Sequence, residues 1–599
     1  MEDFFTHHAS GPLDFARVPA LLAGLDGPDL LRAGRLLARL TPGDVPDART
    51  CTIAVTGQGT LAPLIPALAG ELARHGLLAR TTVGQFGGYL TELADPASEI
   101  YAAKADLTLC VLDAQTVFDE VPVPWRPADV EAVFTAKLAT LENLIGRFEK
   151  AGGGTLVLNT LPLPHRFTAQ LVDHRSRAQL GAVWREATAR LLRLGEEHPG
   201  VVVLDLDPLI AEGIAVDEPR FRSYAGLHLS EPLLARYARE IGHLGRGVAG
   251  TTKKVLVLDL DGTTWGGVLG EDGQDGVRVD GAFRDFQRVI KQIGSQGVLL
   301  AVASKNDAEP VARMLRDHEG MTLREDDFVR VTANWRPKHD NLTVLADDLN
   351  LGVDSFVFVD DSPGECGLVR RELPGVSVVQ VDVEPALHVG KLLRDGWFDV
   401  RELTVEDGKR VTKYRDELVR KDFLDSFDSI EQYLKELEVR VVLAEADAQQ
   451  VPRVSQLTLR TNQFNLTTTR LQQPQVQAML DNPQWTVLTI ASSDRFGDNG
   501  LVEVLFARRD GTTVHLDNFV LSCRVFSRGI EQACLSALLG RAKAEGATEV
   551  LAAYRPTAKN GKVAGLYPRY GFAEAGEGLF RHDLADIVEV PDHLHLEQR

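Results

Sequence analysis

The sequence predicts an α/β protein that contains more than one sheet. Short runs of aliphatic residues alternate with segments of helical periodicity, and several runs end on an acid or a serine. A short continuous apolar run is typical of a strand buried in a parallel sheet. Polar residues directly after such strands lie where an open α/β sheet places its ligand chemistry. The chain therefore presents candidate catalytic groups at predicted strand ends.

The central block, residues 251–400, contains the most informative runs. VLVLDLD, VLLAVAS and SFVFVDD are predicted strands that end on polar side chains, and the polar turn NWRPKHDN adds a lysine. Taken singly, each is more often a turn residue or a helix cap. Together and in this order they favour one site, whose residues are Asp259, Asp261, Ser304, Lys338, Asp360 and Asp361.

These residue types suit phosphoryl transfer. Asp259 would be the nucleophile that forms an aspartyl-phosphate, and Asp261 would act as general acid and then as base. Ser304 and Lys338 would bind and neutralise the phosphoryl oxygens.

The same acids predict a magnesium site, because Mg²⁺ prefers hard oxygen ligands. Asp259 and Asp360 would be ligands, with Asp361 in support. The backbone carbonyl of Asp261 would add a further oxygen to this Mg²⁺ site.

The first block, residues 1–250, begins with helical patterning and then alternates short strands and helices, which predicts another α/β sheet. Its expected strands are CTIAVTG, LTLCVLD, TLVLNTLPLP and VVVLDLDPL. A charged helical connector is expected at 401–434. The last block, 435–599, combines the strands TVLTIASS, LVEVLFARR and TVHLDNFVL with the helix RGIEQACLSALLGRAKAEG, which predicts a mixed α+β region.

Composition narrows the classes of partner. The chain has 599 residues and a net charge of −20. Because nucleic acid and anionic membrane surfaces attract clustered positive charge, we expect this chain to bind neither. The five cysteines show no metal-ligand spacing, which suits a reducing cytoplasm. We see no signal peptide and no apolar run long enough to span a bilayer, so a cytoplasmic location is expected.

The central block resembles the haloacid dehalogenase superfamily, and more closely its FkbH-like branch (subfamily IIIC). The resemblance rests on DLDGTTWGGVLGEDG, AFRDFQRVIKQI, ASKND, ANWRPKHDN and SFVFVDDSPGE. It implies a Rossmann-like domain in which the six residues above hold the superfamily's nucleophile, acid/base, phosphate-binding, lysine and metal positions. The ASKND motif adds Lys305 and Asn306 to the expected substrate-binding residues.

The flanking blocks resemble the other parts of long FkbH-type proteins. The first is similar to an SGNH-hydrolase domain and places His228 at the catalytic histidine. The nucleophile turn reads Gly57-Gln58-Gly59-Thr60 with no serine, and Ala225 replaces the orienting aspartate, so a degenerate, non-catalytic domain is expected. The last block is similar to N-acetyltransferases. Its expected carrier- or pantetheine-binding residues are Arg524, Arg528, Gly529 and Asn560.

The resemblance implies an enzyme that takes D-1,3-bisphosphoglycerate, removes phosphate and loads a glyceryl unit onto the phosphopantetheine of an acyl carrier protein for polyketide-type biosynthesis. One departure bears on the transfer. Family members commonly have a cysteine directly before the motif serine, whereas this chain has Ala303. Cys366 or Cys523 could substitute, or the carrier thiol could attack directly. The alternatives are a phosphatase for another small phosphorylated metabolite and a non-catalytic scaffold that binds carrier protein.

Overall fold

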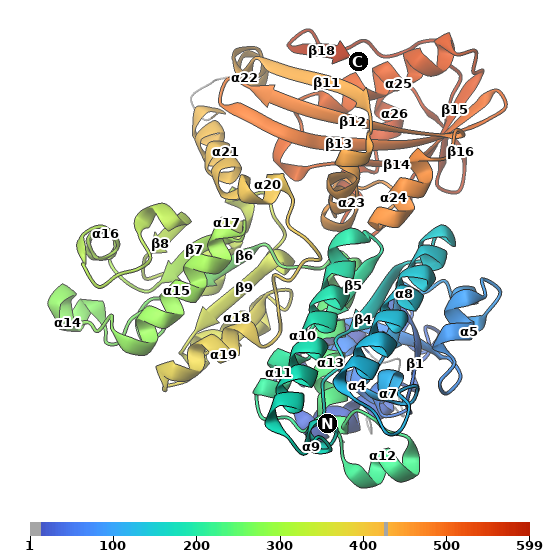
Figure 1. Cartoon of the computed structure of the whole chain (residues 1–599). Helices are drawn as coiled ribbons and strands as arrows, with labels where there is room; N and C mark the ends of the chain where they lie inside the picture. The colour runs from blue at the N-terminus through green and yellow to red at the C-terminus, as the bar shows by residue number, and fades with distance from the viewer. Residues whose placement is uncertain (1–13, 425–428) are drawn as a thin grey trace. The chain divides into compact units, whose positions relative to one another are not determined.

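The computed structural model describes residues 14–424 and 429–599 and has the predicted α/β class (Figure 1). Two compact units result from the packing of the chain. One comprises residues up to Ala249 together with Gln472–Ala478, and the other comprises Gly250–Leu471 with Met479–Arg599. No helix among the described residues combines the length and the apolar character needed to cross a membrane.

The first unit is built on a parallel sheet with the strand order β2-β1-β3-β4-β5. Its strands are β1 Arg49–Gly57, β2 Leu77–Val83, β3 Leu107–Val111, β4 Thr155–Asn159 and β5 Val201–Leu204. Four of these overlap the predicted runs, and β3, β4 and β5 end before their runs do. The strand β2 was not predicted, because its sequence LLARTTV has polar residues in its second half.

Helices cover both faces of this sheet. Helices α4 and α13 contribute buried residues to the core on one face, and α8 and α10 contribute to the core on the other. The longer helices are α3 Gly27–Leu37, α4 Leu64–Arg74, α8 Pro127–Lys150, α10 His174–Glu197 and α13 Glu231–Val248. The shorter ones are α2 Val18–Leu22, α5 Tyr89–Ala94, α6 Glu99–Ala102, α7 Gln115–Phe118, α9 His165–Ala169, α11 Asp207–Ala211 and α12 Pro219–Ala225.

The second unit begins with another parallel sheet, of order β10-β9-β6-β7-β8. Its strands are β6 Val255–Leu258, β7 Leu299–Ser304, β8 Phe328–Ala333, β9 Phe356–Asp360 and β10 Ser377–Gln380. Its helices are α14 Leu269–Gly276, α15 Gly281–Ser295, α16 Ala308–Asp317, α17 Lys338–Asp348, α18 Pro363–Glu372 and α19 His388–Leu393. Strands β6, β7 and β9 are wholly buried, as their unbroken aliphatic runs predict.

One segment of this region departs from its sequence pattern. The segment GGVLGEDGQDGVRV reads as a hairpin, but the structure forms α14 there and keeps only one antiparallel bridge, between Gly266 and Arg278. The helix forms because Leu269 is buried as an apolar anchor, and the non-helical backbone of Gly273 allows a kink inside it.

The C-terminal part of the second unit contains a mixed sheet of order β16-β17-β15-β14-β13-β12-β11-β18, as the α+β prediction requires. Its strands are β11 Val439–Glu445, β12 Trp485–Asp494, β13 Gly497–Asp510, β14 Thr513–Leu521, β15 Glu549–Ala553, β16 Ala573–Gly576, β17 Leu579–His582 and β18 Leu594–Gln598. The helices of the connector and of this part are α20 Val405–Gly408, α21 Arg410–Leu424, α22 Ile430–Leu437, α23 Val451–Arg460, α24 Gln473–Leu480, α25 Ile530–Ala544 and α26 Leu566–Arg569. The buried face of α25 packs into the main core of this region.

Candidate active site

The predicted site forms at the carboxyl edge of the sheet in the second unit. Strand β6 pairs with β7 on one side and with β9 on the other, all in parallel. Asp259 follows β6, Ser304 ends β7 and Asp360 ends β9, so these three residues come from three neighbouring strand ends. The Asp259 backbone N–H donates to the Val359 carbonyl at 2.9 Å, which continues the pairing one residue beyond β6.

Lys338 joins the acids from two of these strands. Its Nζ lies 2.8 Å from Asp259 Oδ1 and 2.6 Å from Asp360 Oδ2, and all three side chains are buried. Lys338 is the first residue of α17, so the short turn after β8 sets the position of the ammonium. The lysine that sequence analysis placed in a loose polar turn thus lies within the carboxylate cluster.

Three carboxylates form a compact oxygen cluster. Oxygens of Asp259, Asp360 and Asp361 lie within 4.8 Å of one another. Three ionised carboxylates against the one charge of Lys338 leave an excess of two negative charges. Hard oxygen donors with this excess fit Mg²⁺, so Asp259, Asp360 and Asp361 are the residues that would hold it.

Burial of the site shifts the pKa values of Asp259, Asp360 and Lys338. Burial raises the pKa of Asp259 and of Asp360 above the usual range, and the ammonium of Lys338 offsets only part of that rise. Burial alone would lower the pKa of Lys338, but the charges of the two carboxylates outweigh it and leave that pKa raised. Buried charges of this kind at a strand edge are characteristic of functional sites.

The turn after Asp261 brings Asp361 into the cluster. Gly262 has φ +71°, and a Cβ at this position would lie 2.4 Å from Asp361 Oδ2, so only glycine fits. The Asp361 backbone N–H donates to Thr263 Oγ1 at 3.1 Å, and Thr264 Oγ1 donates to the Asp259 carbonyl at 2.7 Å. The Gly-Thr-Thr sequence therefore fixes the backbone beneath the two metal-site acids.

Asp261 is held apart from this carboxylate cluster. Its Oδ1 accepts hydrogen bonds from Trp265 Nε1 at 2.8 Å and from the Leu269 backbone N–H at 3.1 Å, and its Oδ2 accepts from Asn306 Nδ2 at 2.9 Å. Three donors thus orient the carboxylate expected to exchange protons. Sequence analysis assigned no role to Trp265, although its position four residues after Asp261 was the available signal.

Two polar residues of the ASKND motif lie in the site, and its lysine lies outside. Asn306 Nδ2 also donates to Ser304 Oγ at 3.1 Å, so a buried amide connects Ser304 to Asp261. Lys305 instead contacts Glu365, with 2.5 Å between Nζ and Oε1, and is partly exposed. The structure therefore brings Ser304 and Asn306 together with Asp261, whereas Lys305 pairs with Glu365 on α18.

The neighbouring cysteine is not available as a replacement nucleophile. Cys366 is fully buried, its Sγ contacts the Asp360 carbonyl at 3.5 Å, and burial raises its pKa to about 12. A thiol with that pKa is scarcely ionised at neutral pH. Ala303, where family members commonly have cysteine, is buried in β7.

The first unit requires a correction. Sequence analysis found no orienting acid for His228, but Asp113 supplies one from the end of β3: its Oδ2 lies 3.0 Å from His228 Nδ1. Burial lowers the pKa of His228, yet the hydrogen bond and charge of Asp113 outweigh burial and leave it raised. The turn of Gly59 and Thr60 packs against this histidine and offers no serine nucleophile.

The four residues expected to bind a carrier or pantetheine arm do not converge. Arg528 is buried and pairs with Glu417 and Asp494, and a Cβ on Gly529 would meet Pro591 and His593 at 3.1–3.3 Å. The fully buried Asn560 binds the carbonyls of Asn465 and Arg555. Arg524 lines a cavity instead.

No protein-family model matches the chain, and no curated protein sequence matches it. Among solved structures, the chain is similar to the N-terminal part of a Bacteroides fragilis protein that contains a phosphatase domain complexed with Mg. The two are 23% identical with a TM-score of 0.56, and the match covers 62% of this chain and 99% of that one. The likeness shows a shared fold.

Smaller matches involve acetyltransferases. An Escherichia coli ribosomal-protein-S18-alanine N-acetyltransferase is 14% identical over 23% of this chain and 79% of its own, with a TM-score of 0.19. A phosphinothricin acetyltransferase from Sinorhizobium meliloti, in complex with acetyl-CoA, is 17% identical over 24% of this chain and 87% of its own, also at 0.19. TM-scores this low carry no information about activity.

Proposed function

We propose that this chain is a Mg²⁺-dependent enzyme that removes phosphoryl groups, with Asp259 as its nucleophile. One observation carries the proposal: Lys338 Nζ contacts both Asp259 and Asp360 at the carboxyl edge of the sheet, and Asp361 completes the acidic cluster. Binding alone would not require a buried lysine between two buried acids with a third beside them. Phosphoryl transfer uses all of these groups.

The residues act in two steps. Asp259 attacks the phosphorus of a phosphomonoester, the P–O bond to the substrate breaks, and Asp261 gives a proton to the departing alkoxide oxygen. Asp261 then takes a proton from water, whose oxygen attacks phosphorus, so that the aspartyl-phosphate is cleaved to phosphate and the carboxylate of Asp259. Lys338 and Ser304 bind the phosphoryl oxygens during both steps.

Magnesium, when bound to Asp259, Asp360 and Asp361, would neutralise charge on the phosphoryl group. The solved structure of similar fold contains a phosphatase domain complexed with Mg, and this supports the magnesium part of the proposal.

For the substrate, the motif resemblance supports D-1,3-bisphosphoglycerate and transfer of its glyceryl unit to an acyl carrier protein. Asp259 would remove the 3-phosphoryl group by the two steps above. The carrier thiol would lose its proton and attack the acyl carbon, the acyl–O bond to the 1-phosphate would break, and inorganic phosphate would leave. Because Ala303 has no thiol and Cys366 is buried, we propose direct attack by the carrier thiol without an enzyme thioester.

A second candidate is a phosphatase that acts on another small phosphorylated metabolite. The absence of a thiol at Ala303 favours it, because the family position that could carry an acyl group cannot do so here. The two candidates share the Asp259 chemistry and differ only in whether a carrier protein accepts the acyl unit.

One experiment separates the candidates. The full chain is incubated with 1,3-bisphosphoglycerate, Mg²⁺ and a phosphopantetheinylated carrier protein, and carrier mass and free phosphate are followed. A glyceryl mass gain with phosphate release above the uncatalysed rate supports the transferase, and phosphate release alone supports the phosphatase. Carrier binding without either product would instead indicate a scaffold.

A matched pair of variants ties the result to the site. Asp259→Asn is expected to abolish enzymatic release of phosphate from the phosphomonoester position, because an amide is a far poorer nucleophile than a carboxylate. Asp285→Asn changes an exposed acid on α15 and is expected to leave the rate unchanged. Full activity of Asp259→Asn would refute the assignment.

A further inference from the structure

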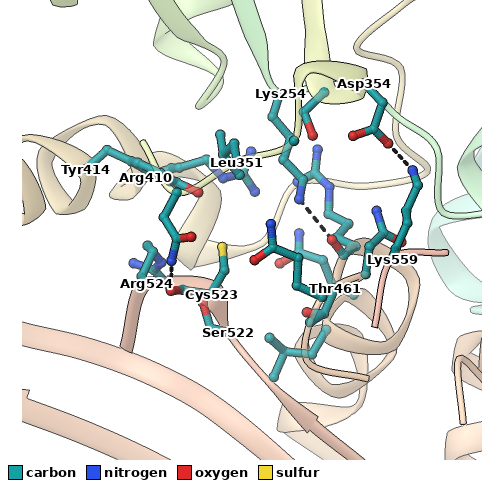
Figure 2. Close-up of a pocket in the computed structure, with 18 of the residues that line it drawn as sticks. Lys254, Leu351, Asp354, Arg410, Tyr414, Thr461, Ser522, Cys523, Arg524 and Lys559 are labelled. Carbon is teal, nitrogen blue, oxygen red and sulfur yellow. Dashed lines mark hydrogen bonds and ion pairs between the residues drawn. The ribbon is translucent and has the colours of Figure 1, made fainter. Parts of the chain in front are cut away.

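A cavity lies within the same unit, at the opposite edge of the parallel sheet from Asp259. It has a volume of about 290 Å³, and Lys254, directly before β6, and residues 350–355, before β9, form one wall. Asp259 and Asp360, in contrast, lie at the far ends of the same strands. Helices α21 and α23 and the segment that follows β14 complete the wall. Figure 2 shows Lys254 and Asp354 approaching from one side and Cys523 and Arg524 from another.

The cavity wall is strongly basic. Six cationic side chains and only two carboxylates line it, although the whole chain carries a net charge of −20. The cations are Lys254, Arg410, Arg453, Arg460, Arg524 and Lys559, and the acids are Asp354 and Glu406. Such an excess of one sign in a concave site is the electrostatic signature of a site for an anion.

Fixed contacts hold several of these cations in place. The buried carboxylate of Asp407 accepts from Arg460 at 2.8 Å and also pairs with Arg410. The Arg453 guanidinium donates to the Leu501 carbonyl from Nε and Nη2 at 3.2 and 2.9 Å. Lys559 forms an ion pair with the lining acid Asp354 (Figure 2). The other contacts above use neutral acceptors or the shared acid Asp407, so part of the positive charge stays uncompensated.

Burial and mutual repulsion both lower the pKa values of several of these cations. Burial lowers the pKa of Lys254 to about 8 and that of Arg460 to about 9, and the charge of Arg410 adds to both effects. Burial likewise lowers the pKa of Arg453 to about 10, with Arg524 as the largest charged contributor. An anion between these side chains would relieve the repulsion that the fold maintains.

The lining also supplies hydrogen-bond geometry for phosphate oxygens. Guanidinium groups present paired N–H donors that match the oxygens of a phosphoryl group. Thr461, Asn462 and Ser522 add neutral donors to the same wall. Phosphoryl groups fit this combination of fork-shaped cations and hydroxyls better than a carboxylate with two oxygens does.

We propose that this cavity binds a small molecule carrying two phosphoryl groups. Six cations against two lining carboxylates leave an excess of four positive charges, and Asp407 beneath Arg410 and Arg460 reduces it to three. Two phosphoryl groups at about −1.5 to −2 each match this excess at neutral pH. The two can be joined as a diphosphate or stand as separate monoesters, and the test distinguishes these sources.

Cys523 provides a local reporter for this site. It lines the cavity and is half-buried, whereas the other four cysteines of the chain are buried. A ligand in the cavity is therefore expected to slow alkylation of Cys523 by iodoacetamide, and peptide mass spectrometry can follow this position separately from the catalytic site.

The experiment uses the full chain carrying Asp259→Asn, without Mg²⁺, so that no phosphoryl group is turned over. Pyrophosphate, coenzyme A, 2,3-bisphosphoglycerate and orthophosphate are each titrated, with Cys523 alkylation and calorimetry as readouts. We expect at least one of the first three to protect Cys523 and to bind at least tenfold more tightly than orthophosphate, which is about 1.4 kcal/mol. Protection by pyrophosphate or coenzyme A identifies a diphosphate, and protection by the bisphosphoglycerate alone identifies separate monoesters.

Substitutions locate the binding. Arg524→Gln and Lys559→Gln should each weaken binding at least tenfold, whereas Arg288→Gln, on the exposed face of α15, should not. Unchanged melting temperatures would show that the variants fold. The proposal is overturned if no probe slows Cys523 alkylation, if orthophosphate binds as tightly as the others, or if folded Arg524→Gln and Lys559→Gln variants bind normally. None of these outcomes depends on catalysis by Asp259.

Discussion

Lys338 Nζ lies 2.8 Å from Asp259 Oδ1, although the two residues are separated by two strands and their helices. The same ammonium reaches Asp360 at 2.6 Å. A cation at the centre of this group keeps buried carboxylates in place and at the same time offers a positive charge to incoming phosphoryl oxygens. Structure and proposed chemistry therefore depend on one side chain.

Replacement of Lys338 should reveal both roles. Lys338→Met removes the cation from a buried cluster and is expected to lower the free energy of unfolding by about 3–5 kcal/mol in the absence of Mg²⁺. Added Mg²⁺ should recover part of this loss, because it neutralises the same acids. Thermal denaturation with and without Mg²⁺ measures the effect. Lys291→Met, which removes a more exposed pair with Asp327, should cost no more than about 1 kcal/mol and should show no Mg²⁺ effect.

Asp261→Asn should separate proton transfer from metal binding. The Asp261 carboxylate is held by Trp265, Asn306 and the Leu269 backbone rather than by the acidic cluster. Phosphate release should therefore fall about 10²- to 10⁴-fold, as expected for loss of a general acid or base. Mg²⁺ affinity, measured by calorimetry, should stay within a small factor of the original, and a large loss of Mg²⁺ binding would contradict this division of roles.

The His228–Asp113 pair predicts a measurable pKa. The imidazole of His228 should titrate above its usual value, and Asp113→Asn should lower that pKa, because burial alone opposes the charged form. Because the pKa of His228 is higher in the folded chain than in the unfolded chain, the pair stabilises the fold fully at pH values below the unfolded-state pKa. This stabilisation is lost as pH rises through the folded-state pKa. NMR titration of the ring protons measures it, and an unchanged pKa in the variant would show that Asp113 does not act on His228.

The basic cavity predicts a loss of anion affinity at alkaline pH. Lys254, with its pKa lowered to about 8, loses its charge as pH rises from 7 to 9, whereas the guanidinium groups of the cavity keep theirs. Arg410, Asp354 and Cys523 face the same ammonium. Calorimetry measures the affinity at each pH. Affinity for the diphosphate probe should fall across this range, and constant affinity would contradict a role for Lys254 in binding.

Sequence pattern predicted the residues of the candidate site because each follows a recognisable strand or turn. Asp259, Ser304 and Asp360 end aliphatic runs, and parallel pairing brings those ends together without further information. Trp265 could have been noticed, since it follows Asp261 by four residues. Its hydrogen bond to that carboxylate, however, depends on how the following loop folds.

Other features of the structure could not be predicted from a short stretch of sequence. Asp113 and His228 are 115 residues apart, and the acid does not occupy the familiar position three residues before the histidine. The basic cavity combines short pieces of several elements, and of its lining cations only Arg524 was expected to bind a ligand. Arg528 resembled a ligand-binding residue, but its burial against Glu417 and Asp494 depends on packing between distant segments.

Detection of a phosphoryl group on Asp259 tests the central claim most directly. The chain is mixed with its phosphorylated substrate, quenched in acid within a single turnover, digested and analysed by mass spectrometry. We predict a Mg²⁺-dependent phosphopeptide that contains Asp259, that accumulates in Asp261→Asn and that is absent from Asp259→Asn. Phosphate release at full rate by Asp259→Asn, or turnover with no phosphoryl group on that peptide at any time point, would contradict the account.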